Sequence, residues 1–177
     1  MQKTIFSFKN IFCKLLFLVG MLGLCFLPRQ TVEANTVRTG ELEGRVVYVL
    51  DGDTVTVLSD NTQYRIRLNG IDAPEKSQPF GRKSKDYLHN LVYQKDVLIT
   101  LYGTDKYGRH IGILSTEEID DVNAAMIEAG MAWHYVKYYP SEEYASLQKE
   151  AQEAGRGLWA DANPIPPWEF RKWRRHK

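Results

Sequence analysis

Short stretches that alternate apolar and polar residues dominate the first half of the chain beyond its N-terminal segment and predict β-strands. Asp51-Gly52 predicts a hairpin between the first two strands, because both residue types tolerate a positive φ. In the third strand, Ile66 and Leu68 share one face and Arg67 lies on the other. The predicted strands are Leu42–Leu50, Thr54–Leu58, Gln63–Ile71, Val97–Tyr102 and Arg109–Leu114.

Helical spacing of apolar residues appears once between these strands and twice after them. Tyr87, Leu88 and Leu91 repeat at the helical period, Gly130 is placed to close the second helix, and Ser141 is placed to cap the third. The predicted helices are Pro79–Tyr93, Val122–Ala129 and Ser141–Gly155. This order predicts an α+β, mainly β fold: a small five-stranded Greek-key barrel with about three helices. A sandwich would need about seven strands, and the alternating units of a parallel sheet are absent.

The first 34 residues have the pattern of a secretory signal peptide. Lysines precede an apolar run, Leu15–Leu27, whose 13 residues fall short of the ~20 that cross a bilayer as a helix. With cleavage after Ala34, we expect a secreted, extracellular protein that begins with a flexible segment, 35–41. The alternative is an uncleaved membrane anchor, because Ile11 and Phe12 lengthen the apolar run.

The charge is divided between an acidic body and a basic end. The chain has 23 Lys+Arg and 22 Asp+Glu, a net charge of +1. Residues 1–34 hold four bases and one acid, so the cleaved chain has a net charge of −2. Arg171–Lys177 holds five of its bases, which leaves −7 on the body. Overall charge therefore does not predict a nucleic-acid-binding protein.

Both cysteines, Cys13 and Cys25, lie in the N-terminal segment, which excludes a disulfide-stapled body and a thiolate zinc site.

The C-terminal tail, residues 164–177, differs in composition from the body. Pro164–Pro167 predicts an extended, stiff segment, and the rest of the tail is basic and aromatic. One interpretation is an electrostatic contact with nucleic acid or an anionic cell surface. The other is that Trp168 and Phe170 dock on the body while the basic end is solvated.

Four acidic residues lie at the breaks between predicted strands. Asp51 and Asp53 flank a glycine in one turn, and Asp72 and Glu75 follow the third strand. Hard divalent cations prefer oxygen ligands of this kind, and no His or Cys nearby favours a softer metal. Each cluster alone is ordinary turn chemistry, but both follow strands that could end on one rim of a barrel.

Two arginines, Arg67 and Arg109, lie on or beside strands. A guanidinium grips phosphate oxygens with two parallel hydrogen bonds, although a lone arginine on a strand is more often solvated or in an ion pair. Together with the carboxylates and a hard metal, they supply the groups that phosphodiester cleavage needs. The cations stabilise charge at phosphorus, and a carboxylate activates water.

Four short motifs occur in one order along the chain. They are Asp51-Gly-Asp-Thr54, Arg67-Leu-Asn-Gly-Ile-Asp-Ala-Pro-Glu75, Thr104-Asp-Lys-Tyr-Gly-Arg109 and Gly157-Leu-Trp159. In this order they resemble the motifs of the thermonuclease family, the calcium-dependent staphylococcal-nuclease-like enzymes. The resemblance covers Leu42 to Trp159 and places the domain at 42–163.

The resemblance implies an OB-fold barrel and a Ca²⁺-dependent enzyme that cleaves DNA and RNA and leaves 3′-phosphates. Ala73 stands where the family often has a threonine, and it keeps the backbone carbonyl. The residues implied by motif position are Asp53, Asp72 and the Ala73 carbonyl as calcium ligands, and Arg67, Glu75 and Arg109 as catalytic groups.

The resemblance also suggests where a nucleotide lies. Lys106 and Tyr107 match residues near a terminal phosphate, and Tyr135, Tyr138 and Tyr139 are candidates for contact with the base, with core packing as the alternative for each. Single-stranded substrate suits such a platform, because bases stack on aromatic rings with little sequence preference. We expect DNA and RNA as partners, no protein partner, and a monomer.

A non-catalytic OB-fold module that binds nucleic acid is the alternative function. Such a module could lose its carboxylates and keep only basic and aromatic residues. This chain retains the carboxylates and both arginines on an acidic body, so the sequence favours the enzyme.

Overall fold

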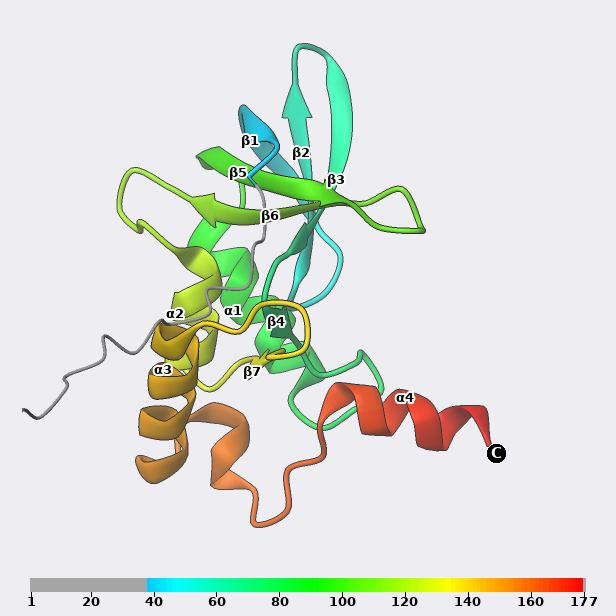
Figure 1. The fold of residues 1–177 in the computed structure, drawn as a ribbon, viewed down its shortest axis with the longest axis vertical. Coiled ribbons are helices and arrows are strands. Elements are labelled where there is room, and N and C mark those ends of the chain that lie inside the picture. Colours follow the sequence, from blue (N-terminus) through cyan, green and yellow to red (C-terminus); the bar gives the residue numbers. More distant parts are fainter. Residues whose placement is uncertain (1–37, 177) are drawn as a thin grey trace, which may run out of the picture. The chain divides into compact units, whose positions relative to one another are not determined.

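The computed structural model describes residues 38–176, so the predicted signal segment and its cleavage site lie outside the described residues. A closed five-stranded barrel forms the upper part of the molecule (Figure 1). Its strand order is β1-β2-β3-β6-β5, with β3 and β6 parallel and the other neighbours antiparallel. The barrel strands are β1 (Gly40–Val49), β2 (Thr54–Ser59), β3 (Thr62–Leu68), β5 (Asp96–Thr104) and β6 (His110–Ser115). The predicted mainly β fold with a five-stranded OB-type barrel is confirmed.

The third predicted strand is too long, because it is two elements. β3 ends at Leu68, and β4 (Ile71–Asp72) pairs instead with β7 (Trp133–His134) in a separate two-stranded sheet. Gly70 lies between them with a φ of 74°, a conformation that glycine adopts without strain. This break lets β4 leave the barrel and carry its carboxylate toward the end of β3.

The turn after β1 forms where it was predicted, but Gly52 is needed for a different reason. Gly52 does not have a positive φ. A Cβ atom at Gly52 would lie 1.9 Å from Ser84 Oγ and 2.7 Å from Ala73 Cβ. The turn therefore packs directly against α1 (Gly81–Val92) and the loop after β4.

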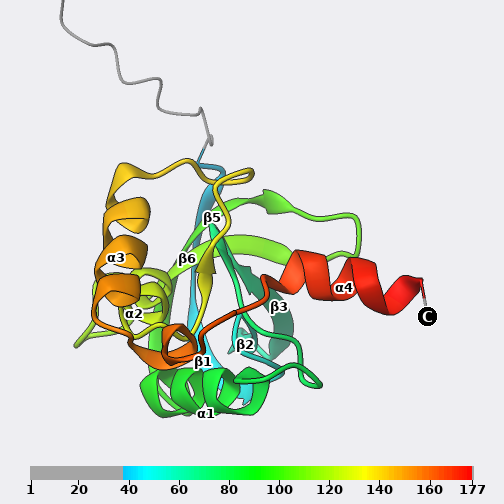
Figure 2. The same ribbon diagram turned by 90° about the horizontal axis from the view of Figure 1, so that it is seen from below.

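Two helices, α1 and α2 (Val122–Glu128), pack against the barrel and α3 (Glu142–Glu153) packs on α2, while a fourth helix projects away from the body on the side opposite α3 (Figures 1 and 2). The three predicted helices correspond to α1, α2 and α3, which is followed by the short 3₁₀ helix η1 (Gly157–Ala160). Asp121 and Ser141 cap α2 and α3 by accepting from the amides of Ala124 and Tyr144. The fourth helix, α4 (Pro167–Arg175), was not predicted.

The core fills the barrel and continues beneath the helices. Val55, Ile66 and Ile99 from the strands are fully buried, as are Leu88 of α1 and Met126 of α2. Within residues 38–176, no helix combines the length and the apolar character that a membrane crossing requires.

Candidate active site

Two carboxylates and one arginine form a buried cluster where β2 begins and where β3 and β4 end. Arg67 Nη1 lies 3.0 Å from Asp53 Oδ2, and Arg67 Nη2 lies 2.9 Å from Asp72 Oδ1. The side chains of Arg67, Asp53 and Asp72 are 14%, 9% and 1% exposed. The sequence analysis placed all three in the site, and the structure brings them into direct contact.

Two hydrogen bonds from neighbouring segments fix the Asp53 carboxylate in this arrangement. Asp53 Oδ2 accepts the amide of Ala73 at 2.8 Å, and Asp53 Oδ1 accepts the hydroxyl of Thr54 at 3.0 Å. Asp72 is the last residue of β4, and its neighbour Ala73 is also buried. The turn after β1 and the chain after β4 are therefore joined at the site, as the two-cluster pattern predicted.

Glu75 lies in a tight loop between β4 and α1. Its amide donates to Gln78 Oε1 at 3.1 Å, and its carbonyl accepts the Gln78 amide at 2.8 Å. A Cβ atom on Gly81 would lie 2.0 Å from the Glu75 carbonyl oxygen, so only glycine lets α1 begin this close to the loop. The first turn of α1 and Gln78 thereby fix the backbone of Glu75 in the loop that follows Asp72.

A third arginine, which the sequence analysis did not predict, completes the cluster. Arg171 of α4 places Nη2 2.7 Å from Asp72 Oδ2 and Nη1 3.1 Å from Asp72 Oδ1. The same Nη1 donates to Glu75 Oε1 at 2.9 Å. Glu75 is thus linked to Asp72 through Arg171. The basic tail is therefore not wholly a solvated terminus, and its first arginine belongs to the site.

Negative charge is crowded in the cluster despite the two arginines. Burial and the neighbouring charge of Asp53 raise the pKa of Asp51 to about 7. Burial also raises the pKa of Asp72, although hydrogen bonds from Arg171 and the charge of Arg67 oppose it. Carboxylates packed this closely favour a bound cation, because a positive charge relieves both burial and repulsion.

The donors of the cluster fit a hard divalent cation in their chemistry. Asp53 and Asp72 offer carboxylate oxygens, and Ala73 offers a backbone carbonyl, as Ca²⁺ prefers. However, within residues 38–176 no three metal-ligating side chains converge on one point. In this structure Arg171 contacts both oxygens of Asp72 and so holds a position that a cation would need.

Arg109 lies at the end of the β5–β6 turn and is paired outside the cluster. Asp105 accepts from the Arg109 amide at 3.0 Å and lies 2.7 Å from its Nη2. Tyr107 in the same turn is 72% exposed, and the charged groups of Lys106 and Arg109 lie 5.0 and 5.7 Å from the centre of its ring. The turn therefore presents two cations and an aromatic ring to solvent, held in place by Asp105.

The tyrosines after α2 separate into surface and core residues. Tyr138 is 59% exposed, and its ring meets that of Tyr135 edge-on at 4.7 Å. Tyr139 packs with the hydrophobic core and meets the ring of Tyr144 at 5.2 Å. His134 is buried, and its Nε2 lies 2.7 Å from the Tyr139 carbonyl oxygen. Tyr138 therefore stays a candidate for contact with a base. Tyr135 stays a candidate only on the side of its ring that Trp168 of α4 does not cover, and Tyr139 and His134 have packing roles.

Comparison with known proteins identifies the class that this barrel and cluster define. The family model "Staphylococcal nuclease homologue" matches residues 65–161. An uncharacterised endonuclease of Escherichia coli is 45% identical over 135 residues, which cover 76% of this chain and 88% of that protein. An uncharacterised endonuclease of Haemophilus influenzae is 46% identical over 129 residues, 72% of each chain. A micrococcal nuclease of Shigella flexneri is 38% identical over 146 residues, 76% of this chain and 82% of its own.

The chain belongs to the staphylococcal nuclease homologue family. It is a nuclease, and the predicted resemblance and enzyme class are confirmed. The alternative of a non-catalytic binding module is accordingly set aside.

Proposed function

We propose that this protein is a secreted, Ca²⁺-dependent nuclease that hydrolyses phosphodiester bonds of DNA and RNA and leaves 3′-phosphates. The observation that carries the proposal is the buried Asp53–Arg67–Asp72 cluster with Glu75 held beside it. Buried carboxylates in this number are costly unless a cation or a proton compensates them. A divalent cation with a phosphate meets that need and brings the substrate to the same place.

The proposed calcium ligands are Asp53, Asp72 and the carbonyl of Ala73. When bound, Ca²⁺ would supply positive charge for the phosphate oxygens and for the charge that develops at phosphorus. Asp53 and Asp72 come from different elements, and the Ala73 amide and Arg67 hold them together. This preorganisation supports a metal role, because ligands that are already placed lose little freedom on binding.

Arg67 and Arg109 are the proposed donors to the phosphate, and Glu75 is the proposed general base. Arg67 contacts both proposed carboxylate ligands, so its guanidinium could share one phosphate with the cation. Arg109 is tied to Asp105, which orients the guanidinium while leaving part of it exposed to solvent. Glu75 lies in the loop before α1 and shares Arg171 with Asp72, which supports a role in orienting or deprotonating the attacking water.

The proposed substrate surface also includes two groups of aromatic residues outside the cluster. Lys106 and Tyr107 would contact a terminal phosphate and its nucleoside, and Tyr135 with Tyr138 would stack against a base. The exposure of Tyr107 and Tyr138 supports this assignment. Such a shallow aromatic surface suits single-stranded nucleic acid, because a duplex keeps its bases stacked inside.

Digestion of single-stranded DNA and RNA by residues 35–177 tests the catalytic part of the proposal. Chelation should stop cleavage, added Ca²⁺ should restore it, and the products should carry 3′-phosphates. Undiminished cleavage in excess chelator would remove the metal role of Asp53 and Asp72.

N-terminal sequencing of exported protein tests secretion, and the sequence should begin within a few residues of Asn35. Retention in the membrane fraction with an intact N-terminus would replace the secreted form with the anchored one.

A further inference from the structure

The contact between α4 and the carboxylates links the last helix of the chain to the proposed metal site. Arg171 contacts both oxygens of Asp72 and one oxygen of Glu75, at 2.7 to 3.1 Å. Its partners are one proposed metal ligand and the proposed general base. A guanidinium is positively charged throughout the physiological pH range, so both contacts are ion pairs.

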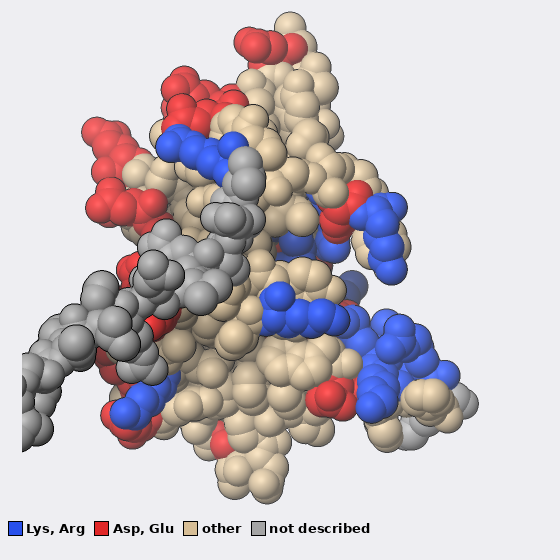
Figure 3. Space-filling model, viewed as in Figure 1, with Lys and Arg blue, Asp and Glu red and all other residues tan. Residues whose placement is uncertain are grey.

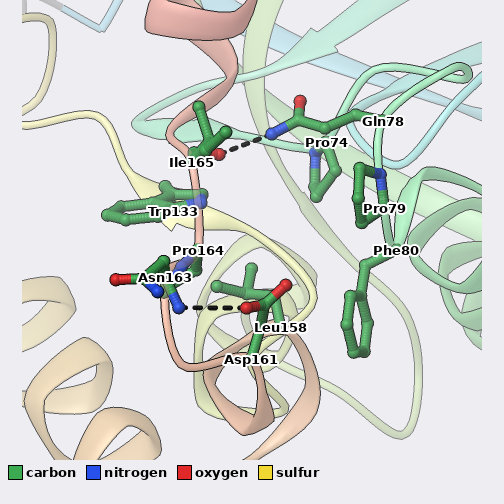
Figure 4. Close-up of a pocket in the computed structure, with 10 residues that line it drawn as sticks. All are labelled: Pro74, Gln78, Pro79, Phe80, Trp133, Leu158, Asp161, Asn163, Pro164 and Ile165. Carbon is green, nitrogen blue, oxygen red and sulfur yellow. Dashed lines mark hydrogen bonds between the residues drawn. The ribbon is translucent and has the colours of Figure 1, made fainter.

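Two further contacts place α4 over the site. The ring of Trp168 stacks on that of Tyr135, with centroids 5.1 Å apart and planes 8° from parallel. Before the helix, the carbonyl of Ile165 accepts a hydrogen bond from Gln78, the residue that also holds the backbone of Glu75 (Figure 4). Gln78 therefore connects the loop of the proposed general base to the segment that carries Arg171.

Beyond these contacts α4 is mostly exposed and basic. Residues 172–176 are exposed, and the last turn carries Lys172, Arg174 and Arg175. In Figure 3, Lys and Arg side chains gather over α4. The Arg171 side chain is 36% exposed, whereas that of Asp72 is 1% exposed. Moving the Arg171 side chain away from Asp72 therefore uncovers a carboxylate, whereas moving the whole helix also separates Trp168 from Tyr135.

We propose that Arg171 is a further residue of the active site, one that occupies Asp72 in the metal-free enzyme and is displaced when a divalent cation binds. The inference rests on the proposed function, because it takes Asp72 as a metal ligand. α4 (Pro167–Arg175) is then a latch, and its position depends on whether the metal site is filled.

The argument is electrostatic. A Ca²⁺ ion binds carboxylate oxygens at 2.3–2.6 Å, and both oxygens of Asp72 already accept hydrogen bonds from Arg171. A guanidinium and a divalent cation in contact with one buried carboxylate repel each other strongly, because the surrounding protein screens charge poorly. Arg67 approaches Asp72 at one oxygen only, and Asp53 shares its charge. Arg171 is therefore the cation that metal binding displaces.

If the metal displaces Arg171, two effects must be equal in size: the effect of the docked latch on Ca²⁺ affinity, and the effect of Ca²⁺ on docking of the latch. If the docked latch lowers the affinity for Ca²⁺, then Ca²⁺ must weaken the docking of the latch by the same factor. The released helix would remain tethered by the segment 164–166 beside the site, with its basic residues near an incoming phosphate chain.

Calorimetric titration of the full mature protein with CaCl₂, without nucleic acid, measures the effect of the docked latch on Ca²⁺ affinity. Arg171→Met keeps an unbranched apolar stem and removes the charge, so it should raise Ca²⁺ affinity about fivefold or more, within the usual range of such couplings. Arg175→Met is the matched control, because it removes the same charge from an exposed position of the same helix. The control should change the affinity less than twofold, which excludes an effect of net charge.

Hydrogen exchange of the unmodified protein measures the effect of Ca²⁺ on docking of the latch. This measurement does not depend on the folding of a variant. Ca²⁺ should speed amide exchange in α4 and leave α3 unchanged. Equal Ca²⁺ affinity in wild type and Arg171→Met, with unchanged exchange in α4, would overturn the latch and leave the proposed function standing. Absence of Ca²⁺ binding in both proteins would overturn the metal assignment and the latch together.

Discussion

Replacing Arg67 should destabilise the protein more than replacing any exposed arginine. Arg67→Met removes the only side chain that bridges Asp53 and Asp72 among the residues described, and both carboxylates are at least nine-tenths buried. Breaking a buried ion pair by removing one partner costs ~3–5 kcal/mol, because the remaining charge is uncompensated. Asp72 keeps Arg171, and Asp53 keeps the Ala73 amide, so the expected loss lies near the lower limit, about 3 kcal/mol.

Urea unfolding at pH 7 in the presence of chelator, followed by tryptophan fluorescence, measures this loss. The midpoint should fall with little change in the dependence on urea, since the extent of unfolding is the same. Arg65→Met is the matched control, because Arg65 precedes Arg67 by two positions on β3 and is exposed. Its effect should stay within about 0.5 kcal/mol. Arg67→Lys should fall between the two, since a lysine restores the charge and cannot bridge two carboxylates with one planar fork.

Calcium provides an independent check on the same variants. A divalent cation supplies the charge that Arg67→Met removes, so saturating Ca²⁺ should narrow the difference in stability between that variant and wild type. A loss no larger than that of Arg65→Met would refute the reasoning, because it would mean that Arg67 does not compensate the carboxylates. If Arg67→Met loses about 3 kcal/mol of stability and Ca²⁺ does not reduce this loss, the stabilising role of the Arg67 ion pairs is supported and the metal site is contradicted.

Three further predictions concern other parts of the molecule. Glu75→Gln keeps the shape of the side chain and should slow cleavage by ~10²–10⁴-fold in single-turnover kinetics, with little change in the binding of a short single strand. The control is Glu117→Gln at an exposed position, which should change neither the cleavage rate nor the binding. Burial raises the pKa of Asp121, against opposing hydrogen bonds from Ala124 and Tyr144, so the folded state binds a proton more readily than the unfolded state and stability falls as pH rises through the raised pKa. The change in melting temperature that Asp121→Asn causes should therefore be a few degrees more favourable at pH 7 than at pH 4. An equal change at both pH values would contradict the raised pKa of Asp121. Deleting residues 171–177 should flatten the salt dependence of binding by about 0.7 per lost phosphate contact, measured at saturating Ca²⁺, and an unchanged slope would leave nucleic acid without a contact there.

The barrel was predictable because its signals are local. Alternation of apolar residues and turn pairs such as Asp60-Asn61, both of which have a positive φ, lie within a few residues of the strands that they define. The break between β3 and β4 had a local signal as well. Asn69-Gly70 is a turn dipeptide, and recognising it would have ended the third strand at Leu68.

The reason for Gly52 could not be found in the same way. A glycine beside two aspartates looks like a residue chosen for its φ, whereas the structure requires it because Ser84, in a helix 32 positions away, leaves no room for a side chain. The chemical identity of the turn was therefore correct, and its physical cause depended on packing between distant segments.

The tail had one unused local signal and one property beyond the reach of sequence patterns. Pro167 at the first position of a basic, aromatic segment is typical of a helix start, because its fixed φ suits the first turn and its missing N–H has no partner to lose there. That signal predicts α4 and places Trp168 and Arg171, three positions apart, on one face. It does not predict which arginine of the tail meets Asp72. That choice depends on where Gln78 holds Ile165 and where Tyr135 receives Trp168, and each of these contacts joins segments that are far apart in the chain. Five bases in seven residues suggest a diffuse electrostatic surface, but the fold gives one of them a specific carboxylate partner and leaves the exposed remainder beside the site, where substrate phosphates would arrive.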